Sequence, residues 1–179
     1  PIDFAIDGAG HCDITMTWQG KHTELPEFGL LFPLRRELTE VSYLGLGPRE
    51  TTADRTAGGK MGAWSYNVRQ DFAQNTPVYP QECGSRTGVY RAAVTGSGLN
   101  IGIGFAGDSM TFSALPYTPH ELENARHLYE LPRDDNKTVV RCAAFQRGVG
   151  GDNSWGAKPH ADDCFAVEKG TSFRFTIQK

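Results

Sequence analysis

The sequence has no apolar run of about 18 residues, the length that a helix needs to cross a membrane. It has no concentration of lysine and arginine either, because eighteen basic residues stand against twenty-one acidic ones for a net charge of −3. Contact with a nucleic-acid backbone requires a dense basic surface, so neither a membrane nor a nucleic acid is an expected partner. The opening residues PIDFAIDGAG lack the basic start and apolar block of a signal peptide, which leaves the compartment open between cytoplasm and periplasm.

Cysteine and histidine are scarce and scattered. Spacings of 71, 59 and 22 residues match no zinc motif and are too sparse for a disulfide scaffold, which leaves four ordinary thiols: Cys12, Cys83, Cys142 and Cys164. The five histidines form no H-E-x-x-H pair, and His120 and His127 lie seven residues apart. We expect no metal site in this chain.

Glycine and proline are abundant instead, with 21 and 10 residues, and such frequent turn formers favour short strands over long helices. Apolar residues alternate along CDITMTW (12–18) and FRFTIQK (173–179), as in half-buried antiparallel strands. Eight more strands are predicted, at 28–34, 40–46, 63–69, 88–95, 99–105, 109–115, 138–145 and 163–169. The sequence therefore predicts an all-β fold, an antiparallel β-sandwich, in a single domain over residues 1–179.

One segment has helical spacing. Thr118 suits an N-cap, Pro119 the first helical position and Glu121 the third. Apolar residues then recur at helical intervals until Pro132, at Leu122, Ala125, Leu128 and Tyr129. This pattern predicts one short helix near 119–131.

Signals for catalysis are weak. Retaining glycoside hydrolysis needs two carboxyl groups about 5 Å apart, and no such pair stands out. The acids in loops are more simply interpreted as turn or cap residues that accept backbone hydrogen bonds: Glu50, Asp54, Glu82 and Asp152. Ser109 is a remote candidate for the nucleophile of a serine hydrolase. It lies between two predicted strands without the G-x-S-x-G pattern, so a hairpin turn is favoured there. We expect no catalytic residue in this chain.

The stretch GVGGDNSWG (148–156) surrounds Trp155 with glycine. An indole offers a rigid apolar face that matches the C–H face of a pyranose ring. Gly151 and its neighbouring glycines permit close backbone approach, and Asp152, Asn153 and Ser154 supply hydrogen-bonding groups beside the ring. On chemistry alone two interpretations stay open: Trp155 is a stacking platform for a saccharide, or it folds back into the core while the glycines make a tight turn.

Four motifs together resemble a known family. They are YLGLGPRETTADR (43–55), VYPQECGSR (78–86), FSALPYTPHELENARHLYEL (112–131) and the GVGGDNSWG loop. In this order they are similar to the C-terminal domain of the large β-galactosidases of glycoside hydrolase family 2. The chain departs from that family's pattern at Thr51-Thr52, where Asn-Tyr is usual, at Cys83, where asparagine is usual, and at Ala143-Ala144, where an acidic residue and an aromatic are common.

The resemblance implies a super-sandwich like that of galactose mutarotases, here truncated on its N-terminal side. It also implies that the family's two catalytic glutamates and its site magnesium belong to a central (β/α)8 barrel outside this chain. The chain itself would then hold no cofactor. Its expected partners are a galactoside substrate and the barrel domain, in cis or as another subunit.

The resemblance further implies a substrate-binding role for the loop. The tryptophan of the family's G-G-D-x-S-W loop stacks on sugar at the aglycone side, a role that falls on Trp155, with Gly151, Asp152, Asn153 and Ser154 beside it. Arg55 and Arg86 are interpreted as loop fasteners that pair with carboxylates such as Glu50 or Glu82. A free-standing carbohydrate-binding module remains the alternative function.

Overall fold

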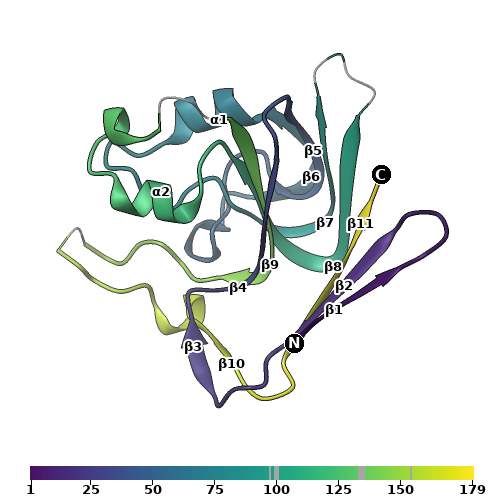
Figure 1. Cartoon of the computed structure of the whole chain (residues 1–179). Helices are drawn as coiled ribbons and strands as arrows, with labels where there is room; N and C mark the ends of the chain where they lie inside the picture. Colours follow the sequence, from purple (N-terminus) through teal and green to yellow (C-terminus); the bar gives the residue numbers. More distant parts are fainter. Residues whose placement is uncertain (97, 99–100, 133–135, 154) are drawn as a thin grey trace.

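The computed structural model describes residues 1–96, 98, 101–132, 136–153 and 155–179. Antiparallel strands dominate it and form one nine-stranded sheet with a separate two-stranded sheet, which confirms the all-β class (Figure 1). The α-helices of the described residues, α1 (Val68–Asn75) and α2 (Pro119–Asn124), are both short. Among the described residues, no helix has the length and hydropathy needed to span a membrane.

Seven strands follow one another across the main sheet, in the order β1 (Ile2–Ile6), β2 (Cys12–Thr17), β11 (Ser172–Gln178), β8 (Gly102–Leu115), β7 (Arg86–Gly96), β5 (Leu38–Gly47) and β6 (Lys60–Asn67). Two more strands branch from β8, because β9 (Lys137–Gln146) pairs with β8 and β4 (Glu27–Arg35) pairs with β9. The small sheet joins β3 (Thr23–Leu25) to β10 (Phe165–Val167).

The long strand β8 creates two layers. Its first half pairs with β11 at 104–107 and its second half pairs with β9 at 111–115. The β4–β9 pair consequently packs across the sheet, and the Phe32 ring lies 5.9 Å from the rings of both Phe105 and Phe175. These aromatic contacts form the centre of the main hydrophobic core.

The predicted alternation along the strands is confirmed in β2 and β11. Ile14 and Met16 are buried, as are Phe173 and Phe175, and all four belong to the main core. The prediction of a turn at Ser109 is wrong, because β8 runs without a break from Gly102 to Leu115. The predicted strands 99–105 and 109–115 are therefore one strand, although residues 99 and 100 lie outside the described residues.

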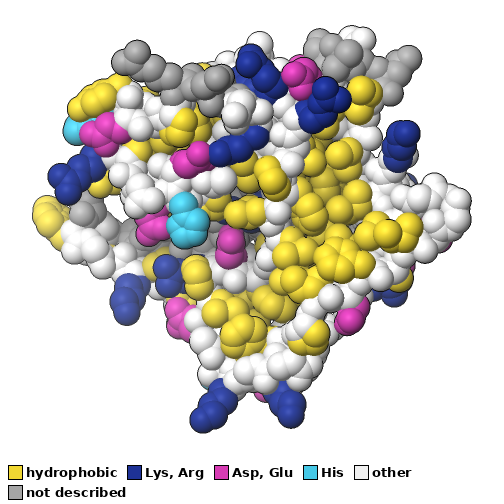
Figure 2. Space-filling model, in the orientation of Figure 1, with side chains coloured by type: hydrophobic (Ala, Val, Ile, Leu, Met, Phe, Trp, Pro, Cys, Tyr) yellow, Lys and Arg dark blue, Asp and Glu magenta, His cyan; other side chains and the backbone are white. Residues whose placement is uncertain are grey.

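The apolar face of the sheet extends past the core onto strand β1. Ile2, Phe4 and Ile6 are exposed, although their partners in β2 include the buried Ile14 and Met16. Figure 2 shows hydrophobic side chains gathered over this side of the sheet, with charged side chains around them. The surface of β1 is thus a continuation of a buried layer that is left open to water.

Helix α2 begins as predicted. Thr118 Oγ1 accepts a hydrogen bond from the Glu121 amide at 3.2 Å, and Glu121 Oε2 accepts one from the Thr118 amide at 2.7 Å. The predicted end near residue 131 is wrong, because the helix stops at Asn124 and a separate 3-10 turn, η2, follows at Leu128–Glu130. Ala125 has an extended backbone and is buried in a second small core with Leu122 and Leu131, so packing overrides the helical pattern there.

Helix α1 replaces the end of a predicted strand. The segment 63–69 was predicted to be extended, but β6 ends at Asn67 and α1 begins at Val68. The Asn67 side chain accepts hydrogen bonds from the amides of Arg69 and Gln70, which makes it the N-cap. Strands β1 and β3 were likewise not predicted.

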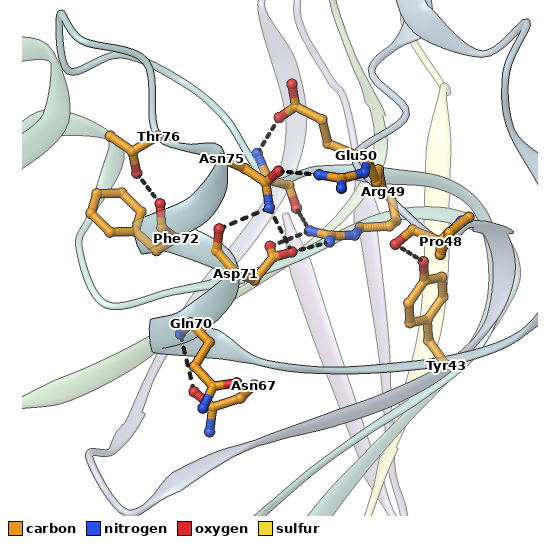
Figure 3. Close-up of polar contacts among 12 residues, drawn as sticks. Tyr43, Pro48, Arg49, Glu50, Asn67, Gln70, Asp71, Phe72, Asn75 and Thr76 are labelled. Carbon is orange, nitrogen blue, oxygen red and sulfur yellow. Dashed lines mark hydrogen bonds and ion pairs between the residues drawn. The ribbon is translucent and has the colours of Figure 1, made fainter.

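Arg86 fastens α1 to the sheet. Its guanidinium donates two hydrogen bonds to Asp71, at 2.8 and 3.0 Å, and it lies over the Tyr66 ring at 4.2 Å. Figure 3 shows the neighbouring contacts, in which Asn75 donates to Asp71 and accepts from Arg49. The fastening role of Arg86 is confirmed, but its partner is Asp71 rather than Glu50 or Glu82.

Replacing Asp71 by alanine should destabilise the fold strongly. The Arg86 side chain is 1% exposed, so it would be left as an uncompensated buried charge, at a cost of about 3–5 kcal/mol. Urea titration of the full chain measures the change in the free energy of unfolding. Asp3→Ala, at an exposed position of β1, is the matched control. A loss no larger than that of the control would contradict the importance of the pair.

Candidate functional site

Trp155 lies on the loop between β9 and the 3-10 turn η3 (Ala161–Asp163), at the left of Figure 1. The base of this loop is fixed by two backbone hydrogen bonds, from the Arg147 amide to the Pro26 carbonyl at 2.8 Å and from the Gly148 amide to the Asp163 carbonyl at 2.9 Å. The Trp155 side chain itself is 90% exposed. The interpretation in which Trp155 folds back into the core is therefore wrong.

Hydrogen bonds inside the loop orient its backbone. Asn153 Oδ1 accepts from the Trp155 amide at 2.8 Å, and Gly156 has a φ of +86° that favours glycine. A Cβ on Gly151 would collide with the carbonyl oxygens of Ala157 and Lys158, so the close return of the loop requires glycine there. Asn153 and Gly151 thus shape the loop around Trp155, and Ser154 lies outside the described residues.

Asp152 pairs with His160 across the loop. The Asp152 Oδ1 atom lies 2.8 Å from His160 Nε2, and both side chains are largely exposed. The hydrogen bond that His160 donates to Asp152, together with the negative charge of Asp152, raises the pKa of His160 above the ordinary histidine value. Exposed pairs of this kind contribute little to overall stability, so the pair acts on the local shape of the loop.

Asp54 anchors the loop from a distant part of the chain. It lies in the 3-10 turn η1 (Ala53–Arg55), where its Oδ1 accepts from Thr52 Oγ1 at 2.7 Å and its Oδ2 accepts from the Gly150 amide at 2.9 Å. Partial burial raises the pKa of Asp54, but the hydrogen bonds from Thr52 and from the amides of Gly150 and Val149 outweigh it and hold this pKa below the ordinary range. Asp54 therefore binds backbone amides, as predicted for a loop acid, but in a distant segment of the chain rather than in its own turn.

Glu50 connects the segment 43–55 to the segment 78–86. Its Oε1 pairs with Arg55, and its Oε2 accepts a hydrogen bond from the Gly84 amide at 2.7 Å. The prediction that Arg55 fastens a loop through Glu50 is therefore confirmed. Figure 3 shows that Tyr43 donates to the Pro48 carbonyl in the same segment. The two motifs lie side by side next to the turn that holds Asp54.

A cleft of about 500 Å³ opens beside the base of the loop, next to the buried side chain of Arg141. The Arg141 guanidinium binds both oxygens of Glu82, at 2.7 and 2.8 Å, and its Nε lies 2.8 Å from Glu27 Oε2. Burial raises the pKa of Glu27, and the attraction of Arg141 offsets this only in part. The single guanidinium of Arg141 thus pairs with both carboxylates. The sequence did not predict this role, because the partners of Arg141 are distant in the chain.

Ser109 lies in a smaller cavity of about 280 Å³, which Thr111, Asp162 and Asp163 also line. No histidine in the described part of the chain makes a hydrogen bond to Ser109, so the histidine base of a serine hydrolase is not positioned there. The described residues also contain no group of three His, Cys, Asp or Glu side chains arranged to hold a metal ion. All four cysteines are free thiols, as predicted.

The fold and the loop define an all-β sandwich domain that presents one exposed tryptophan beside loops joined by carboxylates. Comparison with protein families agrees, because the model of the beta-galactosidase small chain matches residues 1–177. The chain belongs to this family.

Three relatives show how this domain occurs in other proteins. A beta-galactosidase of Lactobacillus delbrueckii subsp. bulgaricus is 37% identical over 99% of this chain and 17% of its own length. A beta-galactosidase of Priestia megaterium is 38% identical over 87% of this chain and 15% of its own length. A beta-galactosidase small subunit of Latilactobacillus sakei is 36% identical over 87% of this chain and 52% of its own length. The chain thus spans about half of a small subunit and a much smaller part of the long relatives.

Replacing Asp54 by alanine should loosen the loop without unfolding the domain. A hydrogen bond to a charged group contributes about 1.5–3 kcal/mol, so the Gly150 amide should exchange its hydrogen at least about tenfold faster. Hydrogen exchange followed by NMR measures this rate. Asp162→Ala, an exposed acid near the same loop, is the control. Equal exchange at Gly150 in the wild-type and Asp54→Ala chains would show that Asp54 is not the anchor.

Replacing Asp152 by asparagine should lower the pKa of His160 toward its ordinary value, because the largest cause of the raised pKa is removed. The pair is strongest while His160 is protonated, below the ordinary histidine pKa of about 6.5, and weakens as the pH rises through the raised folded pKa. An NMR titration of the imidazole measures the shift. An unaltered His160 titration would contradict the pairing.

Proposed function

We propose that this chain is a non-catalytic terminal domain of a β-galactosidase-like glycoside hydrolase, in which Trp155 completes the active-site pocket by stacking on sugar at the aglycone side. One observation carries the proposal: the Trp155 indole is 90% exposed on a loop that is anchored at its base and at Gly150. An aromatic face that is fixed in place and open to water suits the C–H face of a sugar ring.

The braced loop makes the stacking contact effective. Binding loses free energy when mobile groups must be ordered, so a platform held in advance binds more tightly than a free loop. Asp152 and Asn153 precede Trp155 on the same loop, and both are exposed. We assign to these two residues polar contacts with sugar hydroxyls, in addition to their hydrogen bonds within the loop.

The catalytic partner is a (β/α)8 barrel domain that carries the two catalytic glutamates and the site magnesium, either in the same polypeptide or in another subunit. Relatives support both arrangements, because this domain occurs in long proteins named beta-galactosidase and in one named beta-galactosidase small subunit. The exposed apolar face of β1 also supports contact with further protein, because large apolar patches on monomers commonly mark interfaces.

A free-standing carbohydrate-binding module is the second candidate, because an exposed tryptophan could bind sugar without a catalytic partner. The two functions differ in what the isolated chain does. An isolated binding module should bind lactose and release or absorb heat in calorimetry. A pocket-completing domain holds only one wall of the site, so the isolated chain should give no heat with millimolar lactose.

Replacing Trp155 by alanine in the complete enzyme should raise KM for lactose and for an aryl galactoside. An aromatic stacking contact contributes about 0.5–1.5 kcal/mol, which corresponds to a rise of roughly two- to tenfold. Steady-state kinetics with both substrates measures the effect. Trp155→Phe keeps a smaller ring and should recover part of the loss. Unchanged kinetics with both substrates in the alanine variant would reject the proposed role.

A further inference from the structure

The cleft at the base of the Trp155 loop is contiguous with the loop itself. The loop leaves the cleft at Gly148 and Val149 and returns to it at Pro159. Strand β4, the segment 79–82 and helix α2 supply the other walls. Residues on both sides of Trp155 in the sequence therefore line the cleft, which places the cleft at the base of the loop that carries Trp155.

Hydrogen-bond acceptors surround the cleft, and one of them has no partner. Gln146 is 6% exposed and lines both this cleft and the smaller cavity beside Ser109, and its Oε1 makes no hydrogen bond within the described part of the chain. An unpaired buried oxygen is costly, so a donor from a ligand would be favoured there. Glu123, exposed on α2, adds carboxylate oxygens at the rim.

Apolar groups form the rest of the lining. The Tyr79 ring is 58% exposed at the cleft, where the other apolar residues include Leu31, Pro80, Pro119, Val149 and Pro159. The flat ring of Tyr79 beside several hydrogen-bond acceptors suits a sugar ring, which is neutral and carries hydroxyl donors. The lining has charges of both signs, with Arg147 and His120 beside the carboxylates of Glu27, Glu82 and Glu123, so it does not select a ligand of one charge. The described residues offer no cluster suited to a metal ion.

We propose that this cleft is a second sugar subsite, in which Tyr79 stacks on the sugar unit that follows the one bound by Trp155 and Gln146 accepts a hydrogen bond from one of its hydroxyls. The proposal rests on the proposed function, because it extends the aglycone side from one ring to two. The substrate class that it predicts is a galactoside with at least two further sugar units. Lactose has one such unit and would not reach the cleft.

Tyr79→Ala in the complete enzyme tests the subsite. The ratio of kcat/KM for galactosyl-lactose, a linear trisaccharide, to kcat/KM for lactose should fall roughly two- to tenfold, the range expected for one lost aromatic contact. Tyr129→Ala is the matched control, because Tyr129 is also exposed, at 76%, and does not line the cleft. Because Tyr79 is exposed, its replacement should change the free energy of unfolding by no more than about 0.5 kcal/mol.

Gln146→Met provides a second variant, since it removes the amide and keeps the length of the side chain. It should lower the same ratio, and Gln74→Met on the exposed side of α1 is its control. An unchanged ratio in both Tyr79→Ala and Gln146→Met would overturn the subsite. An equal fold loss of kcat/KM with lactose and with the trisaccharide would overturn the subsite as well. The residues would then act through the Trp155 loop.

The failure of this inference can be distinguished from the failure of the proposed function. Trp155→Ala should lower kcat/KM for both lactose and the trisaccharide. The cleft variants should lower kcat/KM selectively for the trisaccharide. An effect of Trp155→Ala without a selective effect at the cleft rejects the subsite alone. No effect of Trp155→Ala on either substrate rejects the proposed function, and the two-ring extension with it.

Discussion

Buried pairing between guanidinium groups and carboxylates is the constraint on which the functional end of the molecule depends. Arg86 binds Asp71 and Arg141 binds Glu82, and both arginine side chains are almost completely buried. Charges removed from water are tolerated only when their partners are in place, so the segments that carry these carboxylates cannot move independently. The segment 78–86 holds one residue of each pair and is thereby fixed between α1 and β9.

The same chemistry extends from the buried pairs to the exposed tryptophan. Glu50 binds the Gly84 amide, and the turn that follows Glu50 places Asp54 against the Gly150 amide. Rigidity is therefore transmitted from the core to a loop that buries little of its own surface. An exposed Trp155 could otherwise be ordered only at the moment of binding, at a cost in conformational entropy.

The sequence was sufficient where a signal was local. Alternation placed Ile14 and Phe175 in the core, and the capping box placed the start of α2 at Thr118. It failed where tertiary packing decides, as in the early end of α2 and the unbroken course of β8 through Ser109. The contact between Asp54 and Gly150 joins residues 96 positions apart, and no local pattern could have indicated it.

The exposed apolar face of β1 and the exposed Trp155 belong to segments that lie apart in the fold. In Figure 1 the hairpin of β1 and β2 is at the right, and the loop that carries Trp155 is at the left. A protein layer confined to Phe4 and its neighbours in β1 need not touch the loop that carries Trp155. Contact with further protein and contact with sugar therefore need not compete, and a substitution on one side can be interpreted without reference to the other.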